Sequence, residues 1–230
     1  MTINNLRFEL SFNSITQLES KLNFCRSNRI KNINIPCKGN IKKEFFKSSI
    51  EYIKKYYSEF NCVNHYSLYH QYSKNEENSY KEFVNFIKKY STSKNFDVLL
   101  CSGSNKKKNF DVIKVINDFK IDNNLGFKFG IAYNPYLGKY WNDYFERERF
   151  DKKLSSGLVK SIWLQFGTDI KSLESEVNYL KNYYKDVKLN IFGSLLIPSK
   201  QFIARFKFRP WRGVYIADKY LNHIEKFNAF

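Results

Sequence analysis

The stretch "LRFELSFNSIT", residues 6–16, places a helix start directly after an apolar run. The run from Leu6 to Phe12 predicts a buried β-strand, and Asn13–Thr16 offers residue types that cap the amino-terminal end of a helix. An open dinucleotide-binding sheet would instead place a Gly-x-Gly-x-x-Gly loop after its first strand. The stretch therefore favours a plain strand-to-helix unit, which is the unit that repeats in a β/α barrel.

Glu9 stands in the middle of this predicted strand, where an unpaired carboxylate would cost several kcal/mol to bury. One interpretation is that Glu9 faces solvent or meets a lysine. The other is that it lies at a strand end in apolar surroundings that keep it protonated for acid catalysis. The strand alone leaves both interpretations open.

Short apolar runs typical of strands alternate with amphipathic helical patterns along the whole chain. Strict alternation predicts parallel strands joined by helices, and eight such units close a barrel. We expect an α/β protein with a (β/α)8 TIM barrel, and an open doubly wound sheet is the main competitor. The runs are Leu6–Ser11, Asn32–Ile35, Cys62–Ser67, Phe96–Cys101, Lys128–Ala132, Ser161–Phe166, Lys188–Ser194 and Gly213–Ile216.

Between these runs, apolar residues recur at the i, i+3/i+4, i+7 spacing of helices with one buried face. At 230 residues and 43% hydrophobic content the chain can bury one large core. We expect a single compact domain over residues 1–230 with a shortened C-terminal part, because residues 198–213 leave room for only a short helix. The clearest helical stripes are Phe46–Tyr57, Phe83–Tyr90, Val112–Phe119 and Ile170–Leu180.

The formal net charge is +17, and the basic residues are spread along the chain together with abundant Asn, Ile, Tyr and Phe. This dispersed charge is as typical of a coding bias as of a binding surface. No nucleic-acid motif is recognised, so a nucleic-acid partner is not expected. The tight cluster Lys106–Lys108 is interpreted as a solvated loop or as a rim that attracts anions.

No apolar run approaches the roughly 18 residues of a membrane span, and the start of the chain lacks the order of a signal peptide. We therefore expect a cytoplasmic protein without a membrane partner. The cysteines are widely separated, with no CxxC pair and no histidine at zinc-finger spacing. This predicts reduced structural thiols and no metal site; the four are Cys25, Cys37, Cys62 and Cys101.

In a β/α barrel, the side chains that carry chemistry follow the carboxyl ends of the strands and share one rim. Several of the expected strand ends carry polar groups, which predicts a site at that rim. The residues there are Glu9, Pro36, His65, Ser102–Ser104, Ala132–Pro135, Gln165 and Ser194.

The order of motifs at these strand ends resembles the methylenetetrahydrofolate reductase family, flavin-dependent (β/α)8 enzymes of one-carbon metabolism. "RFELSF" resembles that family's Phe-Glu-Phe strand, which implies that Glu9 is the general acid near N5 of the folate. "NHYSL", residues 64–68, resembles the family's His-Leu-Thr-Cys strand end, which implies that His65 lies beside the flavin. A hydrogen-bonded structural histidine is the alternative.

Residues 129–157 resemble the family's Ala-Tyr-Pro-Glu…Asp-Ala-Gly stretch. The likeness places Ala132 and Tyr133 on flavin-contacting positions and Lys153 on a lysine that holds the cofactor phosphates, while Glu146 replaces an aspartate. Plain packing is the alternative for Tyr133. An ion pair with Glu146 on the same helical face is the alternative for Lys153.

Two later segments continue the resemblance. "SIWLQFGTD", residues 161–169, resembles Ile-Thr-Gln-Phe-Phe-Phe-Asp, which places Gln165 on the glutamine that hydrogen-bonds the pterin. A satisfied polar group inside the barrel is the alternative. "NIFGSLLIPS", residues 190–199, resembles the family's seventh strand, so the likeness covers most of the chain.

The segment "FKFRPWRG", residues 206–213, has no counterpart in the family pattern. Arg209 and Arg212 are interpreted as substrate-binding residues that clamp an anionic tail by charge-assisted hydrogen bonds. The alternative is a loop whose Trp211 plugs one end of the barrel.

The sequence departs from the family in "LLCSGS", residues 99–104. Ser102 replaces an arginine and Ser104 an aspartate, whereas Gly103 remains. By position, Ser102 and Gly103 would contact the cofactor and Ser104 the substrate. The loss of the aspartate leaves open whether FAD is retained.

The resemblance implies an oxidoreductase that interconverts 5,10-methylene-tetrahydrofolate and 5-methyl-tetrahydrofolate. It also implies a tetrahydrofolate derivative as substrate, FAD as cofactor and NADH or NADPH as electron donor. If FAD is excluded, a directly bound nicotinamide is the alternative. The second functional hypothesis is a folate-binding barrel without redox activity that serves as a subunit or regulator. The oligomeric state stays open, a homo-oligomer included.

Overall fold

The computed structural model describes residues 6–37, 43–102, 110–122, 126–141, 145–211 and 213–226. These residues belong to two compact units, residues 1–130 and residues 131–230. Three predicted site residues, Gly103, Ser104 and Arg212, and the basic cluster Lys106–Lys108 lie outside the described residues. Each unit is described by itself below.

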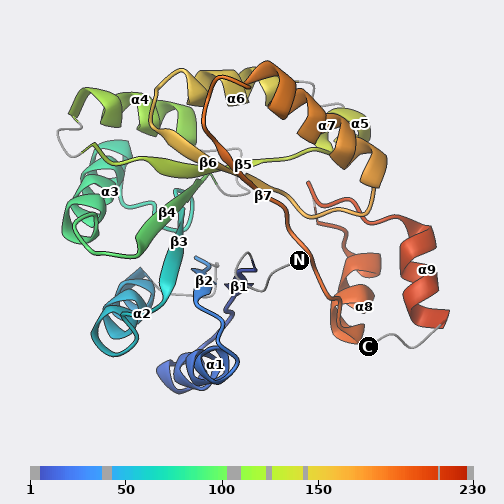
Figure 1. Cartoon of the computed structure of the whole chain (residues 1–230), viewed down its shortest axis with the longest axis horizontal. Helices are drawn as coiled ribbons and strands as arrows, with labels where there is room; N and C mark the ends of the chain where they lie inside the picture. The colour runs from blue at the N-terminus through green and yellow to red at the C-terminus, as the bar shows by residue number, and fades with distance from the viewer. Residues whose placement is uncertain are drawn as a thin grey trace. The chain divides into compact units, whose positions relative to one another are not determined.

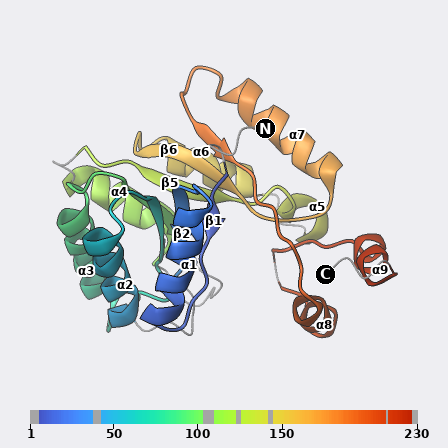
Figure 2. The ribbon, with the colours of Figure 1, turned by 60° about the horizontal axis from the view of Figure 1, so that its bottom comes forward.

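The first unit alternates strands and helices, as the sequence predicts. The pairs β1–β2, β2–β3 and β3–β4 are parallel, and α1 to α4 line one side of these strands (Figures 1 and 2). Its elements are β1 (Phe8–Glu9), α1 (Ile15–Ser27), β2 (Asn32–Ile35), α2 (Lys43–Tyr56), β3 (Asn61–Ser67), α3 (Glu76–Tyr90), β4 (Phe96–Cys101) and α4 (Val112–Asp122).

Strand β5 (Phe129–Tyr133) contains the boundary between the units, and the strand order follows the chain from β1 to β7. Strands β6 and β7 of the second unit are parallel. The other elements of this unit are α5 (Leu137–Trp141), α6 (Glu146–Leu154), β6 (Val159–Leu164), α7 (Ile170–Tyr183), β7 (Asn190–Phe192), α8 (Lys200–Phe208) and α9 (Asp218–Lys226).

The helix start expected after the first strand is confirmed. Ser14 is the N-cap of α1, and its Oγ accepts a hydrogen bond from the Gln17 backbone N–H at 3.2 Å. Asn75 caps α3 in the same way through the Asn78 N–H at 2.8 Å. Each cap satisfies a backbone donor that the first turn of a helix cannot pair internally.

An aromatic cluster forms the core of the first unit on the helix-covered side of the strands. The Phe83 ring of α3 packs edge-on against Tyr66 of β3, with ring centroids 5.2 Å apart. It also contacts Phe119 of α4 at 5.6 Å and Phe129 of β5 at 5.7 Å. Phe83 is fully buried, so one side chain joins two helices and two strands.

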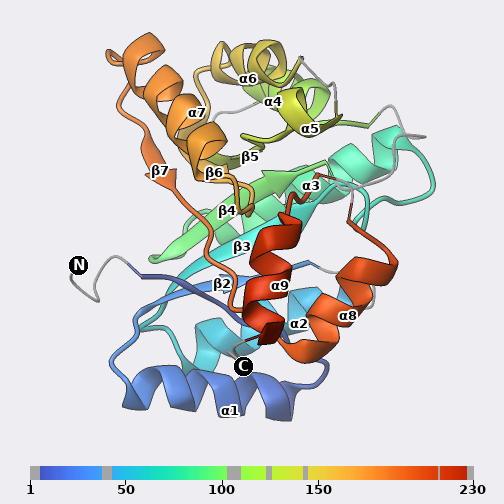
Figure 3. The ribbon, with the colours of Figure 1, turned by 90° about the vertical axis from the view of Figure 1, so that its right-hand side faces the viewer.

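The second unit has a small apolar cluster of its own between α8 and α9, which lie side by side (Figure 3). Ile203 and Phe206 of α8 pack with Leu221 and Ile224 of α9. The short helix expected in the compressed C-terminal part is therefore present as α8, and burial of its apolar stripe holds it in place.

The predicted strands at β2 and β4 are confirmed to the residue, and the remaining strand predictions through the seventh are confirmed with shifted or shortened ends. The prediction for Gly213–Ile216 is wrong as a strand, because Tyr215 forms only an isolated parallel bridge with Gly167. The reason is local: Gly213 has a φ of 82°, and the Val214 N–H donates to Trp211 O at 3.1 Å, which makes a turn.

No helix among the described residues is long and apolar enough to cross a membrane. All four cysteines lie in the described part of the chain as thiols rather than disulfides.

We expect Phe83→Ala to lower the free energy of unfolding by about 3–5 kcal/mol, because it removes a fully buried ring through which α3 contacts three other elements. Urea unfolding followed by circular dichroism measures the change. The control is Phe24→Ala on α1, whose side chain is exposed, with an expected effect of about 0.5 kcal/mol or less. Equal effects of the two changes would contradict this description of the core.

Candidate functional site

Glu9 and His65 lie together at the carboxyl ends of β1 and β3. Glu9 is in register with Asn34, and Asn34 with Val63. Side chains two residues apart share a face of a strand, so His65 projects on the same side as Glu9. The distance from His65 Nδ1 to Glu9 Oε2 is 3.9 Å. The structure therefore brings together two of the residues predicted for the site.

Of the two interpretations of Glu9, the structure supports the one in which its side chain faces solvent. Its side chain is 46% exposed, and the neighbouring Phe8 is also exposed, whereas Leu10 and Phe12 are buried. The regular strand covers only Phe8–Glu9 rather than the whole apolar run. After this strand, burial alternates along the chain, so Leu10 and Phe12 face the core. The Glu9 carboxylate faces the other side, beside His65, whose side chain is 16% exposed.

Arg7, which the sequence analysis did not single out, lies on the same face two residues before Glu9. Its Nε donates to Asn34 Oδ1 at 2.9 Å, and its Nη2 donates to the backbone oxygens of Ile33 and Asn61, both at 2.8 Å. Burial lowers the pKa of Arg7 from its ordinary value. The guanidinium ties β1 to β2 and to the start of β3, and so fixes the strand that carries Glu9.

Ser102 follows β4 and supports the start of α4. Its Oγ accepts a hydrogen bond from the Val112 N–H at 3.4 Å, and its backbone oxygen accepts from the Tyr69 N–H at 3.1 Å. These contacts give the Ser102 side chain a role in holding the segment after β4.

In the second unit, Glu146 and Lys153 of α6 are both buried against the carboxyl end of β5. Glu146 Oε1 accepts from the Asn134 N–H at 3.1 Å, and Lys153 Nζ donates to Ala132 O at 3.4 Å. The seven-residue spacing puts both side chains on one face of the helix. The structure thus places Ala132, Glu146 and Lys153 together at the end of β5.

Tyr133 points from β5 toward α6 and α7. Its ring packs edge-on against Phe150 with centroids 5.3 Å apart, and its hydroxyl donates to Glu176. Arg147 Nη2 donates to the same carboxylate at 2.7 Å. Burial raises the pKa of Tyr133 well above its ordinary value, and the hydrogen bond to Glu176 is the second largest cause. These contacts are those of a packed helix-facing side chain, the alternative considered for Tyr133.

Gln165 directly follows β6 and is exposed. Its backbone N–H donates to Tyr133 O at 2.8 Å, which places the end of β6 beside the end of β5. Its side-chain Oε1 accepts from the Phe166 N–H at 2.9 Å. The side chain therefore lies at a strand end with its amide nitrogen at the surface of the unit.

Asn134 lies in the predicted rim segment, residues 132–135, and forms a hydrogen-bonded link that the sequence did not predict. Its Nδ2 donates to Gly213 O at 2.7 Å, and its Oδ1 accepts from the Tyr136 N–H at 3.0 Å. A side-chain amide thus joins the end of β5 to a turn that is 79 residues away in the chain.

The segment after α8 is exposed. Trp211 is 51% exposed and packs edge-on against Phe202 at 5.2 Å, so the interpretation of Trp211 as a plug is wrong. Lys207 forms an ion pair with Glu225 at 2.7 Å, and Arg209 is exposed. The structure does not bring Arg209 to Gln165 through any contact among the described residues.

Asp169 caps α7 with an unusual number of partners. Its carboxylate accepts from Lys139 Nζ at 2.7 Å, from the Ser172 N–H at 3.2 Å, and from the Tyr140 hydroxyl. The hydrogen bond to Lys139 is the largest cause that holds the pKa of Asp169 well below its ordinary value, and the hydrogen bond to Tyr140 is the second. The cluster fixes α5 relative to the start of α7.

Comparisons with known proteins add no relative: no protein-family model and no curated protein matches the chain. In the part of the chain that the structure describes, no group of three or more His, Cys, Asp and Glu residues could hold a metal ion. The candidate site residues form two local groups. One is Glu9 with His65 in the first unit, and the other lies at the ends of β5 and β6 in the second.

We expect Glu146→Ala to lower the free energy of unfolding by about 1–3 kcal/mol, because the buried Asn134 N–H loses its acceptor. Denaturant unfolding measures the loss. Glu148→Ala on the same helix is the matched control, since its carboxylate is exposed and pairs with Lys152 one turn along the helix. Its expected effect is about 0.5 kcal/mol or less; a similar loss in both variants would refute the anchoring role of Glu146.

The Asp169 cluster predicts a pH dependence of stability. A lowered folded-state pKa means that the unfolded chain takes up the proton first, so the stabilisation is complete above the ordinary value of 3.8 and is lost as the pH falls through the folded value. We expect Asp169→Asn, which can still cap α7, to flatten the fall in melting temperature below about pH 5. Asp186→Asn, at an exposed position, should leave the acid slope unchanged.

Proposed function

We propose that this protein is a folate-dependent oxidoreductase of the methylenetetrahydrofolate reductase type, with Glu9 as its general acid. The observation that carries the proposal is the pairing of Glu9 and His65 across 3.9 Å at the carboxyl ends of β1 and β3. Strand ends are where β/α proteins place catalytic side chains. On the same proposal, the seven strands belong to a (β/α)8 barrel in which the segment after α8 takes the eighth position.

The proposed chemistry is the interconversion of 5,10-methylene-tetrahydrofolate and 5-methyl-tetrahydrofolate. Opening the five-membered ring requires a proton on a ring nitrogen, after which hydride attacks the carbon of the resulting iminium. Glu9 donates that proton, and His65 orients the carboxyl group and exchanges a proton with it. Glu9 is 46% exposed in the protein alone, and on this proposal the bound pterin covers its carboxyl group.

Gln165 is the proposed pterin-binding residue, because an exposed amide at a strand end offers both a donor and an acceptor to an amide-like ring edge. Glu146 and Lys153 act by positioning. Their contacts with Asn134 N and Ala132 O hold the end of β5, which in turn receives the Gln165 N–H through Tyr133 O.

The reaction needs a hydride donor, which FAD reduced by NADH or NADPH supplies in the family. Among the described residues, Lys153, which the resemblance assigns to the flavin phosphates, is buried and donates to Ala132 O, so it does not fit that role. A directly bound NADH or NADPH is therefore the proposed donor.

A second candidate is a folate-binding barrel without redox activity. The observation that favours it is the 46% exposure of Glu9, which is unusual for a carboxyl group that must be protonated at neutral pH.

The test compares Glu9→Gln with the unchanged protein in tetrahydrofolate binding by calorimetry and in NADH oxidation with 5,10-methylene-tetrahydrofolate. We expect binding within about twofold and a loss of turnover of about 10²–10⁴-fold, the usual contribution of a general acid. Glu59→Gln, which alters an exposed ion pair with Arg26, is the control and should keep full turnover.

The outcomes separate the candidates. Pterin binding without turnover in the unchanged protein would support the second candidate. Absence of pterin binding would overturn both. A purified protein that carries a yellow flavin spectrum would overturn the direct-nicotinamide step while leaving the role of Glu9 in place.

A further inference from the structure

A cavity of about 390 Å³ lies in the first unit, at the amino-terminal ends of β3 and β4 and against α2. It is on the helix-covered face, because Cys62 and Asn64 alternate with Val63 and His65 along β3. The cavity is therefore on the opposite face of the strands from the Glu9–His65 group, and it extends along β3 as far as Asn64.

The walls of the cavity are apolar and suit a flat ring. Ile50 and Ile53 of α2 form one wall, and Phe60 and Phe96 border the strand side. All four are buried. A pocket of this size with predominantly apolar walls is typical of small-molecule sites.

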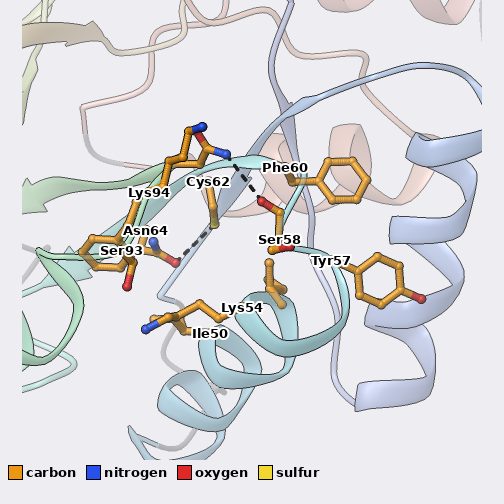
Figure 4. A pocket seen from close by; sticks show the side chains of 12 residues that line it. Ile50, Lys54, Tyr57, Ser58, Phe60, Cys62, Asn64, Ser93 and Lys94 are labelled. Carbon is orange, nitrogen blue, oxygen red and sulfur yellow. Dashed lines mark hydrogen bonds between the residues drawn. The ribbon is translucent and has the colours of Figure 1, made fainter.

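Two polar groups lie inside these walls. The Asn64 amide is fully buried; its Oδ1 accepts from Cys62 Sγ at 3.4 Å and its Nδ2 donates to Asp97 O at 3.2 Å. Figure 4 shows Cys62 and Asn64 directed from β3 toward Ile50 and Lys54 of α2. Burial raises the pKa of Cys62 to about 12, so the thiol is neutral and fixes the orientation of the amide.

The Asn64 amide has hydrogen-bonding capacity beyond these contacts. An amide carries two N–H donors and two acceptor lone pairs, and the bonds that Asn64 makes within the described residues use one of each. The amide has no exposed surface in the protein alone, so a ligand must move the side chains that cover it. The group that its remaining donor and acceptor then match is a hydroxyl, which both donates and accepts.

The charge of the cavity is positive. Lys54 of α2 and Lys94 of the segment before β4 are among its lining residues, which include no aspartate or glutamate. The nearby Glu51 carboxylate is already paired, with Lys89 Nζ at 2.6 Å and with the Tyr90 hydroxyl at 2.7 Å. An anion is thus the complementary ligand.

We propose that this cavity binds a small aromatic carboxylate with a ring hydroxyl. The ring lies between the apolar walls of α2 and Phe96, the carboxylate meets Lys54 and Lys94, and the hydroxyl meets the Asn64 amide. The site goes beyond the proposed folate chemistry and does not depend on it, because it lies on the opposite face of the strands.

The probe is para-hydroxyphenylpropanoate, titrated into the full chain by isothermal calorimetry. We expect micromolar to low-millimolar binding that weakens with added salt, because the carboxylate is attracted by cations near the surface. The neutral para-hydroxyphenylpropanamide should bind about tenfold more weakly. Phenylpropanoate, which lacks the hydroxyl, should also lose affinity because Asn64 gains no partner.

Two sets of variants make the test specific. Lys54→Gln with Lys94→Gln should weaken the carboxylate about tenfold and leave the amide analogue unaffected. Lys81→Gln with Lys88→Gln removes the same charge from exposed positions of α3 that do not line the cavity, and should change neither affinity. Ser93→Phe, at a half-buried lining position, should block binding of the carboxylate and its amide, and Ser58→Phe provides a second blocking change on the exposed rim.

The proposal is overturned if calorimetry detects no binding of the probe, if the two lysine pairs have equal effects, or if neither blocking variant that keeps the normal melting temperature reduces binding. Failure here leaves the folate proposal intact, because pterin titration and the Glu9→Gln variant report on the other face of the strands.

Discussion

The two-residue alternation of side chains along β3 is the constraint on which the first unit depends. One set, which includes Asn64 and Tyr66, faces the helices, and the other, which includes His65, faces the opposite side. Tyr66 joins the aromatic cluster around Phe83, and that packing fixes the strand in one orientation. Because the orientation is fixed, His65 must face Glu9, and the cavity must form on the other face. A shift of one residue in register would exchange the two faces and destroy both features.

Three polar side chains in the second unit bond the backbone at or near the end of β5. Glu146, Lys153 and Asn134 each bond a main-chain group at the end of β5 or in the turn at Gly213. Buried charges are stable only when such partners exist. These polar side chains therefore position the end of β5. Gln165 is an uncharged, exposed amide, and under the proposed function it binds the ligand.

The two proposed sites differ in the kind of side chain that would act on the ligand. At Glu9 and His65, two titratable side chains on an open face suit proton transfer. In the cavity, a neutral thiol and an amide lie behind apolar walls with lysines among the lining residues, which suits recognition without chemistry. The first arrangement is consistent with turnover, and the second with a bound effector or a retained metabolite.

The sequence by itself determined the alternating order of strands and helices through β7, because apolar periodicity and helix caps such as Ser14 are local signals. It also pointed to Glu9, His65, Glu146 and Lys153 as residues that lie near strand ends. Only the tertiary structure decided that Glu9 is exposed, that Tyr133 faces α6 and α7, and that residues 213–216 make an isolated bridge instead of a strand. The contacts of Asn134 and the lining of the cavity at Asn64 could not be predicted either, because they join residues far apart in the chain. No local pattern encodes which distant group a side chain will contact.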